Sequence, residues 1–210
     1  MKPPERLAEA RLILVTDPRE DLAERVRATV RGGVDVVQLR DKRASREELL
    51  PLAGELLEIC EEAGAVFTVN DDVELARLSR AHGVHLGQGD GPLAAAREAL
   101  GLDAVVGRSV GSAAEAVEAV REGADYLGVG TIYATPTKPE EEADGPALLQ
   151  EISDLGLVVP WFAIGGITRE TAGEAAAAGA HGFAVVRAVL DADDPASAAR
   201  ELRSVLQRAS

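Results

Sequence analysis

The feature that most constrains this fold is the regular alternation of short apolar segments with amphipathic helical patterns along the whole chain. The segments expected to form strands are Leu12–Thr16, Val34–Leu39, Val66–Asn70, Gly83–Leu86, Ala104–Arg108, Tyr126–Val129, Trp161–Ile164 and Phe183–Val186. Such alternation implies parallel strands that are covered by helices. Eight units within residues 1–210 predict a single (β/α)8 barrel domain with few insertions.

Local motifs favour the barrel over an open doubly wound sheet. The first strand is followed by Thr16-Asp17-Pro18 rather than by the glycine-rich turn of a dinucleotide-binding fold, and the sequence has no P-loop motif. Helix starts are indicated by Ser45 with Glu48 and by Ser112 with Glu115, since each pair has the spacing of a capping box. These signals agree with helices between the expected strands.

The charge balance limits the classes of partner. The net charge is −14, so nucleic acid and anionic membrane surfaces would be repelled. Apolar runs such as Leu12–Val15 are too short to span a bilayer, and the first residues lack the apolar region of a signal peptide, which makes the cytoplasm the expected location. The small residues Ala175–Ala178 allow close packing against another helix, so a homo-oligomer is left open.

Lysine usage points to anionic ligands. The chain has three lysines, Lys2, Lys42 and Lys138, while arginine supplies nearly all other positive charge. Lys42 and Lys138 both follow expected strands, where a compact ammonium group can bind phosphate oxygens. We therefore expect a site for phosphorylated small molecules.

Polar residues gather after the second, third and fourth strands, at the barrel end where active sites form. Gln38, Arg40 and Lys42 share one parity and would project to the same side of an extended strand. Asp71 and Asp90 follow neighbouring strands, and two carboxylates beside cations suit Mg²⁺ bound together with a substrate phosphate. The alternative for these aspartates is a helix cap and a turn residue.

A second group of residues could bind another anion. Gly166 follows the seventh strand, and Val186 and Arg187 end the eighth, where barrels often hold a phosphate on backbone N–H groups. Thr135 and Thr137 add hydroxyl donors on a loop stiffened by proline. One site with cations and metal suits a diphosphate, and one with neutral donors suits a monophosphate.

Taken together, these motifs resemble those of thiamine-phosphate synthases over essentially the whole chain. The segments that carry the resemblance are Gln38–Lys42, Val69–Asp71, His85–Asp90, Tyr126–Gly130, Thr135–Lys138 and Ile164–Ile167. The family implies a (β/α)8 barrel that joins 4-amino-2-methyl-5-hydroxymethylpyrimidine diphosphate to 4-methyl-5-(2-phosphoethyl)thiazole, or its 2-carboxy form, and releases diphosphate. It also implies Mg²⁺ as cofactor and a dissociative substitution.

The resemblance assigns roles residue by residue. Arg40, Lys42, Ser109 and Lys138 would be catalytic, and Asp71 and Asp90 would hold Mg²⁺. The pyrimidine diphosphate would be bound by Gln38, Arg40, Lys42, Asn70, Ser109 and Lys138. The thiazole phosphate would be bound by Thr135, Thr137, Gly166 and the backbone of Val186 and Arg187. Leu39, Asp41 and Pro136 would also belong to the substrate-binding residues.

The sequence departs from the family pattern at three positions and leaves other functions open. Arg187 stands where a serine is expected, Gly111 where histidine is common and Thr131 where proline is common. A thiazole tautomerase would use the same barrel but would not need Lys42, Asp71, Asp90 and Lys138. A non-catalytic protein that binds thiamine precursors is another alternative. An aldolase is disfavoured because no lysine lies within an expected strand.

Overall fold

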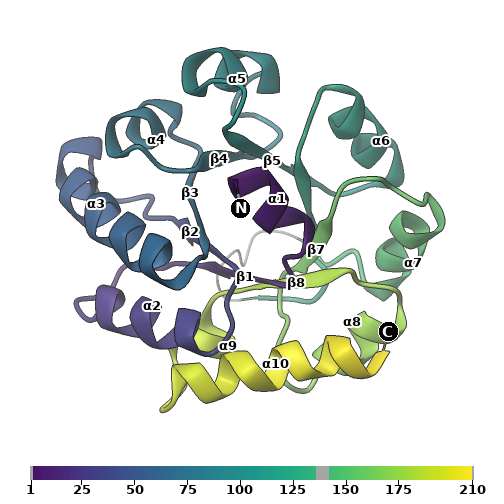
Figure 1. The fold of residues 1–210 in the computed structure, drawn as a ribbon. Helices are drawn as coiled ribbons and strands as arrows, with labels where there is room; N and C mark the ends of the chain where they lie inside the picture. The colour runs from purple at the N-terminus through teal and green to yellow at the C-terminus, as the bar shows by residue number, and fades with distance from the viewer. Residues whose placement is uncertain (1, 136–141, 210) are drawn as a thin grey trace.

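The computed structural model describes residues 2–135 and 142–209 and contains a closed barrel of parallel strands in sequential order (Figure 1). The strands are β1 Leu12–Val15, β2 Val36–Leu39, β3 Val66–Asn70, β4 Gly83–Leu86, β5 Val105–Val110, β6 Tyr126–Val129, β7 Trp161–Ile164 and β8 Gly182–Val185. Closure occurs where Leu14 of β1 pairs with Val185 of β8. All eight expected strands are thus confirmed, with small shifts at their ends.

Most helices follow a strand and form an outer ring around the barrel, whereas the first helix precedes β1 and is not part of that ring (Figure 1). They are α1 Pro3–Ala8, α2 Leu22–Arg31, α3 Arg46–Ala63, α4 Val73–Ser79, α5 Leu93–Leu100, α6 Ala113–Arg121, α7 Pro146–Asp154, α8 Ala172–Ala177, α9 Arg187–Leu190 and α10 Pro195–Ala209. Within the described ranges, none of these helices combines the length and apolar character that crossing a bilayer requires.

Two apolar layers stabilise the barrel, because side chains alternate along each strand. Leu12 and Leu14 of β1 point outward and pack with the helices, whereas Ile13 and Val15 point inward. Tyr126 and Phe162 fill much of the interior. The burial of these large side chains is the main favourable contribution to folding.

Glycines on neighbouring strands make room for the interior rings. A Cβ atom at Gly107 would lie 2.3 Å from Cε1 of Tyr126, and one at Gly182 would lie 2.6 Å from Cδ1 of Phe162. The rings of Tyr126 and Phe162 pack edge to face, with centroids 6.0 Å apart. Gly107 and Gly182 therefore leave the space that the rings of Tyr126 and Phe162 occupy in the barrel interior.

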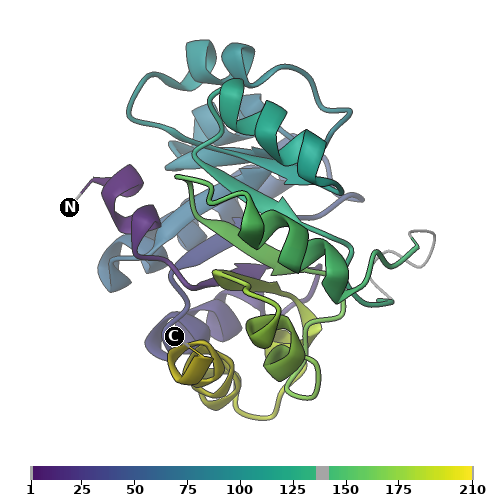
Figure 2. The same ribbon diagram turned by 90° about the vertical axis from the view of Figure 1, so that its right-hand side faces the viewer.

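Helix α1 lies across one end of the barrel, as two perpendicular views show (Figures 1 and 2). Its Leu7 is buried, and Ala10 follows it into the apolar cluster that contains the inward residues of the strands. This end is the one at which the strands begin. The other end, where the strands finish, carries the loops that the sequence assigned to function.

The helix starts follow the sequence signals closely. Ser45 and Glu48 form the expected reciprocal capping box at the start of α3. At α6, Ser112 accepts a hydrogen bond from the N–H of Glu115, as expected. The Glu115 carboxylate, however, accepts from the N–H of Gly111 at 2.7 Å, one residue before the position a capping box would use.

Candidate active site

Most of the described candidate residues lie at the end of the barrel where the strands finish. Gln38 and Asn70 are on β2 and β3, Ser109 is on β5, and the Asp71 and Asp90 loops follow β3 and β4. Strand pairing places these loops next to one another, since Asn70 pairs with His85 and Gln38 with Thr68. Neighbouring strands about 4.8 Å apart therefore bring the polar groups to one rim.

Asp71 and Asp90 face each other at this rim. Asp71 is half-buried, and its burial together with the neighbouring Asp90 carboxyl group raises its pKa to about 6. The hydrogen bond from the protonated Asp71 lowers the pKa of Asp90. Below about pH 6, the Asp71 carboxyl group is thus protonated and hydrogen bonds to Asp90, as is usual for two carboxyl groups that lie close together.

The backbone around Asp71 also sets it apart from ordinary helix-capping residues. Asp71 has φ of 64°, in the left-handed region that few residues other than glycine adopt. The N-cap of α4 is instead Asp72, which accepts a hydrogen bond from Leu75 N–H at 2.8 Å. Asp71 is therefore not needed as a cap, and its strained conformation fits a functional role.

Cationic side chains flank the carboxyl pair. Lys42 Nζ lies 3.9 Å from Oδ2 of Asp71, and both Lys42 and Arg40 act to lower the pKa of Asp71. The Arg40 backbone is fixed by Thr16, whose Oγ1 accepts from Arg40 N–H at 2.9 Å. The rim thus carries local positive charge on a chain whose net charge is −14.

The donor set fits Mg²⁺ completed by substrate oxygens. Asp71 and Asp90 offer hard carboxylate oxygens from adjacent loops and lie close enough to hydrogen bond to each other, so both would reach one cation once the proton is lost. Among the described residues, no three His, Cys, Asp or Glu side chains gather into a fuller metal cage. Mg²⁺ commonly takes one or two carboxylates, with waters and phosphates as its other ligands.

The carboxyl pair predicts a pH-dependent stability of the metal-free protein. Because the pKa of Asp71 is raised to about 6, the folded state binds more protons than the unfolded state between about pH 4 and pH 6. Stability should fall as pH rises through this window. Asp71→Asn removes the cost of ionising a half-buried carboxyl group beside Asp90. It should raise the free energy of unfolding by about 1–2 kcal/mol at pH 8, with little gain at pH 4. Urea titrations with EDTA measure both values.

Asp72→Asn is the matched control for that experiment. Burial opposes ionisation of Asp72, but hydrogen bonds from Arg46 and Leu75 outweigh it and lower its pKa. Its replacement should therefore cost stability at pH 8 relative to pH 4, with the opposite sign. An equal effect of Asp71→Asn at both pH values would contradict the raised pKa of Asp71.

Inside the barrel, a polar group lies directly below the rim. His85 Nε2 is 2.9 Å from Ser109 Oγ, and the His85 ring packs on Tyr126 with centroids 5.3 Å apart. Burial raises the pKa of the Tyr126 hydroxyl, although the side chains of Gln38 and Thr68 oppose that shift. His85 and Ser109 therefore form a buried polar pair beside the Tyr126 ring, and Gln38 lies near the hydroxyl of the same tyrosine.

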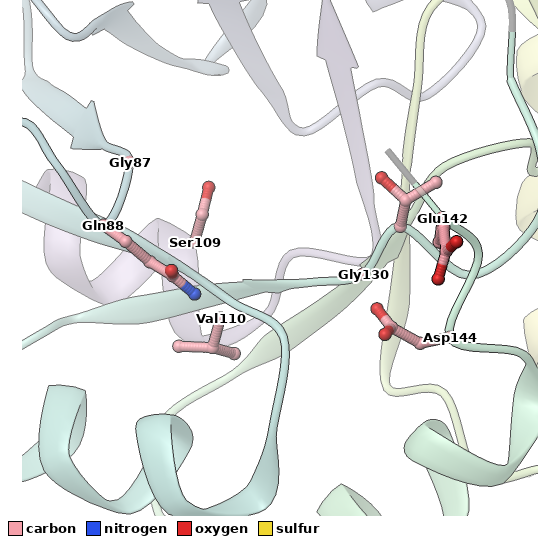
Figure 3. A pocket seen from close by; sticks show the side chains of 8 residues that line it. Gly87, Gln88, Ser109, Val110, Gly130, Glu142 and Asp144 are labelled. Atoms are coloured by element: carbon pink, nitrogen blue, oxygen red, sulfur yellow. The ribbon is translucent and has the colours of Figure 1, made fainter. Parts of the chain in front are cut away.

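A cavity of about 430 Å³ opens beside Ser109. Its lining residues are Gly87, Gln88, Ser109, Val110, Gly130, Thr131, Glu142 and Asp144. Figure 3 shows Glu142 and Asp144 on the side of the cavity opposite Gln88 and Ser109. The cavity extends the site toward β6 and does not itself include the Asp71 and Asp90 pair.

The second expected anion site begins at the glycine pair after β7. Gly165 and Gly166 have φ of 96° and 61°, and a Cβ on Gly166 would lie 2.6 Å from Cβ of Tyr133. Tyr133 N–H donates to the Gly165 carbonyl at 3.0 Å, so the segment that leads to Thr135 lies against the pair. Val186 and Arg187 are the N-cap and first residue of α9, which follows β8, the strand that pairs with β7. Pro136, Thr137 and Lys138 lie outside the described residues.

Two predicted binding residues use their side chains elsewhere. Leu39 is buried in the apolar layer between the strands and the helices, so contact with a ligand is limited to its backbone. Asp41 Oδ1 accepts from Arg43 N–H at 2.8 Å and from Ala44 N–H at 3.3 Å, which stabilises its own loop. The alternation of a strand explains Leu39, and turn chemistry explains Asp41.

Several residues of the site were not predicted from the sequence. His85 had no catalytic or binding role assigned from the sequence, yet its Nε2 hydrogen bonds with Ser109 Oγ. Gln88, in the loop after β4, donates a side-chain hydrogen bond to Glu115 in the first turn of α6. His85 has the same parity as Gly83 on β4, and this parity could have indicated that its side chain faces the barrel interior. No local signal predicts the bond between Gln88 and Glu115, which are 27 positions apart.

Comparisons with known proteins agree with this arrangement. The sequence profile described as thiamine monophosphate synthase matches residues 12–189. A thiamine-phosphate synthase of Streptomyces avermitilis is 44% identical over 98% of this chain and 97% of the relative. One of Synechocystis sp. is 45% identical over 97% of this chain but only 59% of the relative, so the chain spans less than two thirds of that protein.

A solved structure extends the comparison to three dimensions. Thiamine phosphate pyrophosphorylase from Pyrococcus furiosus is 34% identical, has a TM-score of 0.85 and is matched over 98% of both chains. The profile match covers every strand of the barrel and the rim loops between them. On these matches, this chain belongs to the thiamine monophosphate synthase family.

Proposed function

We propose that this chain is a thiamine-phosphate synthase that joins the pyrimidine diphosphate to the thiazole phosphate. The observation that carries the proposal is the Asp71 and Asp90 carboxyl pair flanked by Arg40 and Lys42. A tautomerase that binds only a monophosphate has no use for this group. A diphosphate leaving group needs both a metal site and neighbouring cations.

In the reaction, the bond between the pyrimidine methylene carbon and the diphosphate oxygen breaks, and the oxygen keeps the electron pair. A carbon–nitrogen bond to the thiazole then forms. Arg40 and Lys42 hold the diphosphate and stabilise the charge that grows on it, with Lys138 as a third cation from the sequence assignment. Mg²⁺ held by Asp71 and Asp90 would supply further charge neutralisation of the leaving group.

The pyrimidine is placed beside Ser109 and its buried partner His85. Gln38 and Asn70 lie on β2 and β3 and can donate to and accept from ring nitrogens and the amino group. Ser109 is oriented by its hydrogen bond with His85, which holds the hydroxyl at the barrel wall. These contacts fix the ring so that its methylene carbon faces the thiazole.

The thiazole phosphate is assigned to the opposite part of the rim. The glycine pair at Gly165 and Gly166 lets residues 131–134 pack closely against this turn, which brings the segment leading to Thr135 beside it. Backbone N–H groups of the turn would bind the phosphate. Thr135, with Thr137 from the sequence assignment, adds hydroxyl donors. A neutral donor set suits a monophosphate that must remain bound while the diphosphate departs.

The direct test is incubation of purified protein with both precursors and Mg²⁺, followed by detection of thiamine phosphate by mass spectrometry. A reaction that lacks the pyrimidine diphosphate is the control, and the thiazole should remain unchanged in it. Conversion of the thiazole alone would indicate the isomerase instead. Binding of both precursors without product would indicate a non-catalytic precursor-binding protein.

Arg187 gives a further prediction, because the resemblance to the family leads us to expect serine at this position. Its Nε lies 3.7 Å from Asp17 Oδ2, and the side chain is about half exposed at the rim. We expect Arg187→Ser to change the thiazole-phosphate KM by less than about threefold, or roughly 0.7 kcal/mol, and to leave kcat unchanged. Steady-state kinetics measure this. A tenfold rise in KM would show that the guanidinium binds the phosphate.

A further inference from the structure

Arg108 is a buried cation that the proposed reaction does not use. It lies on β5 between Gly107 and Ser109, and it is paired with Leu86 at the end of β4. Since Ser109 faces inward toward His85, Arg108 points to the opposite face of the strand. It is 7% exposed, and a charged group at this burial requires specific partners.

The partners of Arg108 lie on both sides of Asp90. Its Nη1 donates to the Gly87 carbonyl at 2.6 Å, and its Nη2 donates to the Gly91 carbonyl at 2.8 Å. One guanidinium therefore bridges the two ends of the Gly87–Gly91 loop that presents Asp90. A carboxylate of Glu122 lies 3.7 Å from Nη2 on the outer side.

The Asp90 carboxylate depends on the same peptide groups. Its Oδ2 accepts from Gly87 N–H at 2.8 Å, and its own N–H donates to the Gly87 carbonyl at 3.2 Å. That carbonyl is one of the two that Arg108 binds. Loss of the guanidinium would release the Gly87 peptide, and with it the orientation of the Asp90 side chain.

We propose that Arg108 is a positioning residue that fixes the Gly87–Gly91 loop so that Asp90 can bind a divalent cation together with Asp71. The inference rests on the metal assignment of the proposed function. Arginine suits this task because its planar fork reaches two acceptors at once, whereas one lysine ammonium on a flexible stem does not reproduce that geometry. Groups that orient metal ligands commonly change metal affinity tenfold or more when removed.

The test is direct titration of the purified protein with Mn²⁺, followed by electron paramagnetic resonance, with and without inorganic diphosphate. We expect Arg108→Met to weaken Mn²⁺ binding about tenfold or more and Arg108→Lys to give an intermediate loss. In turnover assays, the apparent Mg²⁺ requirement should rise while the thiazole-phosphate KM stays the same. Asp90→Asn marks the loss caused by removal of a ligand.

Arg97 provides a matched control at the other end of the barrel. Its guanidinium also donates to two backbone carbonyls, those of Ala104 and Gly123, and to Asp125. These residues precede β5 and β6, away from the rim. Arg97→Met should therefore lower the unfolding midpoint as Arg108→Met does, while Mn²⁺ affinity remains that of the unmodified protein.

Each outcome decides the question. Unchanged Mn²⁺ affinity in Arg108→Met, or equal losses in the Arg108 and Arg97 variants, would overturn the positioning role. Mn²⁺ binding that does not depend on Asp71 and Asp90 would overturn the metal site and this inference with it. If the pair binds Mn²⁺ but no thiamine phosphate is formed, the proposed function fails, and the Arg108 titration still judges the positioning role.

Discussion

Replacing either Asp71 or Asp90 by asparagine is expected to lower kcat at least a hundredfold, on the order of 3 kcal/mol in transition-state stabilisation. Each change keeps the size of the side chain but removes half of the charge that would hold Mg²⁺ against a departing diphosphate. The measurement is steady-state formation of thiamine phosphate at saturating substrates. Excess EDTA should abolish the activity of the unmodified protein.

Asp72→Asn is the control for this pair, because Asp72 caps α4 and lies next to Asp71 in the sequence. Asparagine is also a good N-cap, so the protein should remain folded and kcat should change little, despite the loss of stability at pH 8 expected above. Normal turnover in both the Asp71 and Asp90 variants would contradict the metal assignment. So would full activity in excess EDTA.

Gly107→Ala is expected to lower the free energy of unfolding by about 2–3 kcal/mol. The new Cβ would lie 2.3 Å from Cε1 of Tyr126 and 2.6 Å from Nδ1 of His85, so both rings must move within a packed interior. Since His85 orients Ser109, kcat should fall as well. Urea titration and thiamine-phosphate formation measure the two effects.

Gly54→Ala is the matched control on the outside of the barrel. Gly54 lies within α3 and has open space where a Cβ would be added, so alanine should stabilise the helix by up to about 1 kcal/mol. The two substitutions add the same methyl group and should have opposite signs. A neutral Gly107→Ala would show that the interior can absorb the methyl group without displacing either ring.

Much of the fold could be predicted because its signals are local. The expected strand at Val66–Asn70 has the same limits in the structure, since apolar β-branched residues and flanking turns define it. The expected start at Val34 is two residues too early. Asp35 is not part of β2, and its carboxylate accepts from the N–H groups of Arg11 and Leu12. This long-range contact leaves no trace in the local pattern.

The site could be predicted as far as strand ends determine it. The opposed carboxyl groups of Asp71 and Asp90 follow from their positions after neighbouring strands. The bonds that Glu115 makes to Gln88 and Gly111 do not, because its spacing from Ser112 indicated a capping box. Arg108 was likewise read only as the end of a strand. Side chains that bind distant backbone groups require the three-dimensional arrangement to be recognised.

Helix α1 affects the route by which substrates bind and products leave. Its Leu7 closes the apolar end of the barrel, and the rings of Tyr126 and Phe162 fill the interior above it. Reactants and products would then enter and leave through the same open end of the barrel. In the proposed function, the pyrimidine binds at Ser109, which lies on β5, and the thiazole phosphate binds at Gly166, in the loop after β7. On this assignment, we expect the pyrimidine diphosphate to bind first. Closure of one end of the barrel by α1 thus favours an ordered binding of the two substrates at the other end.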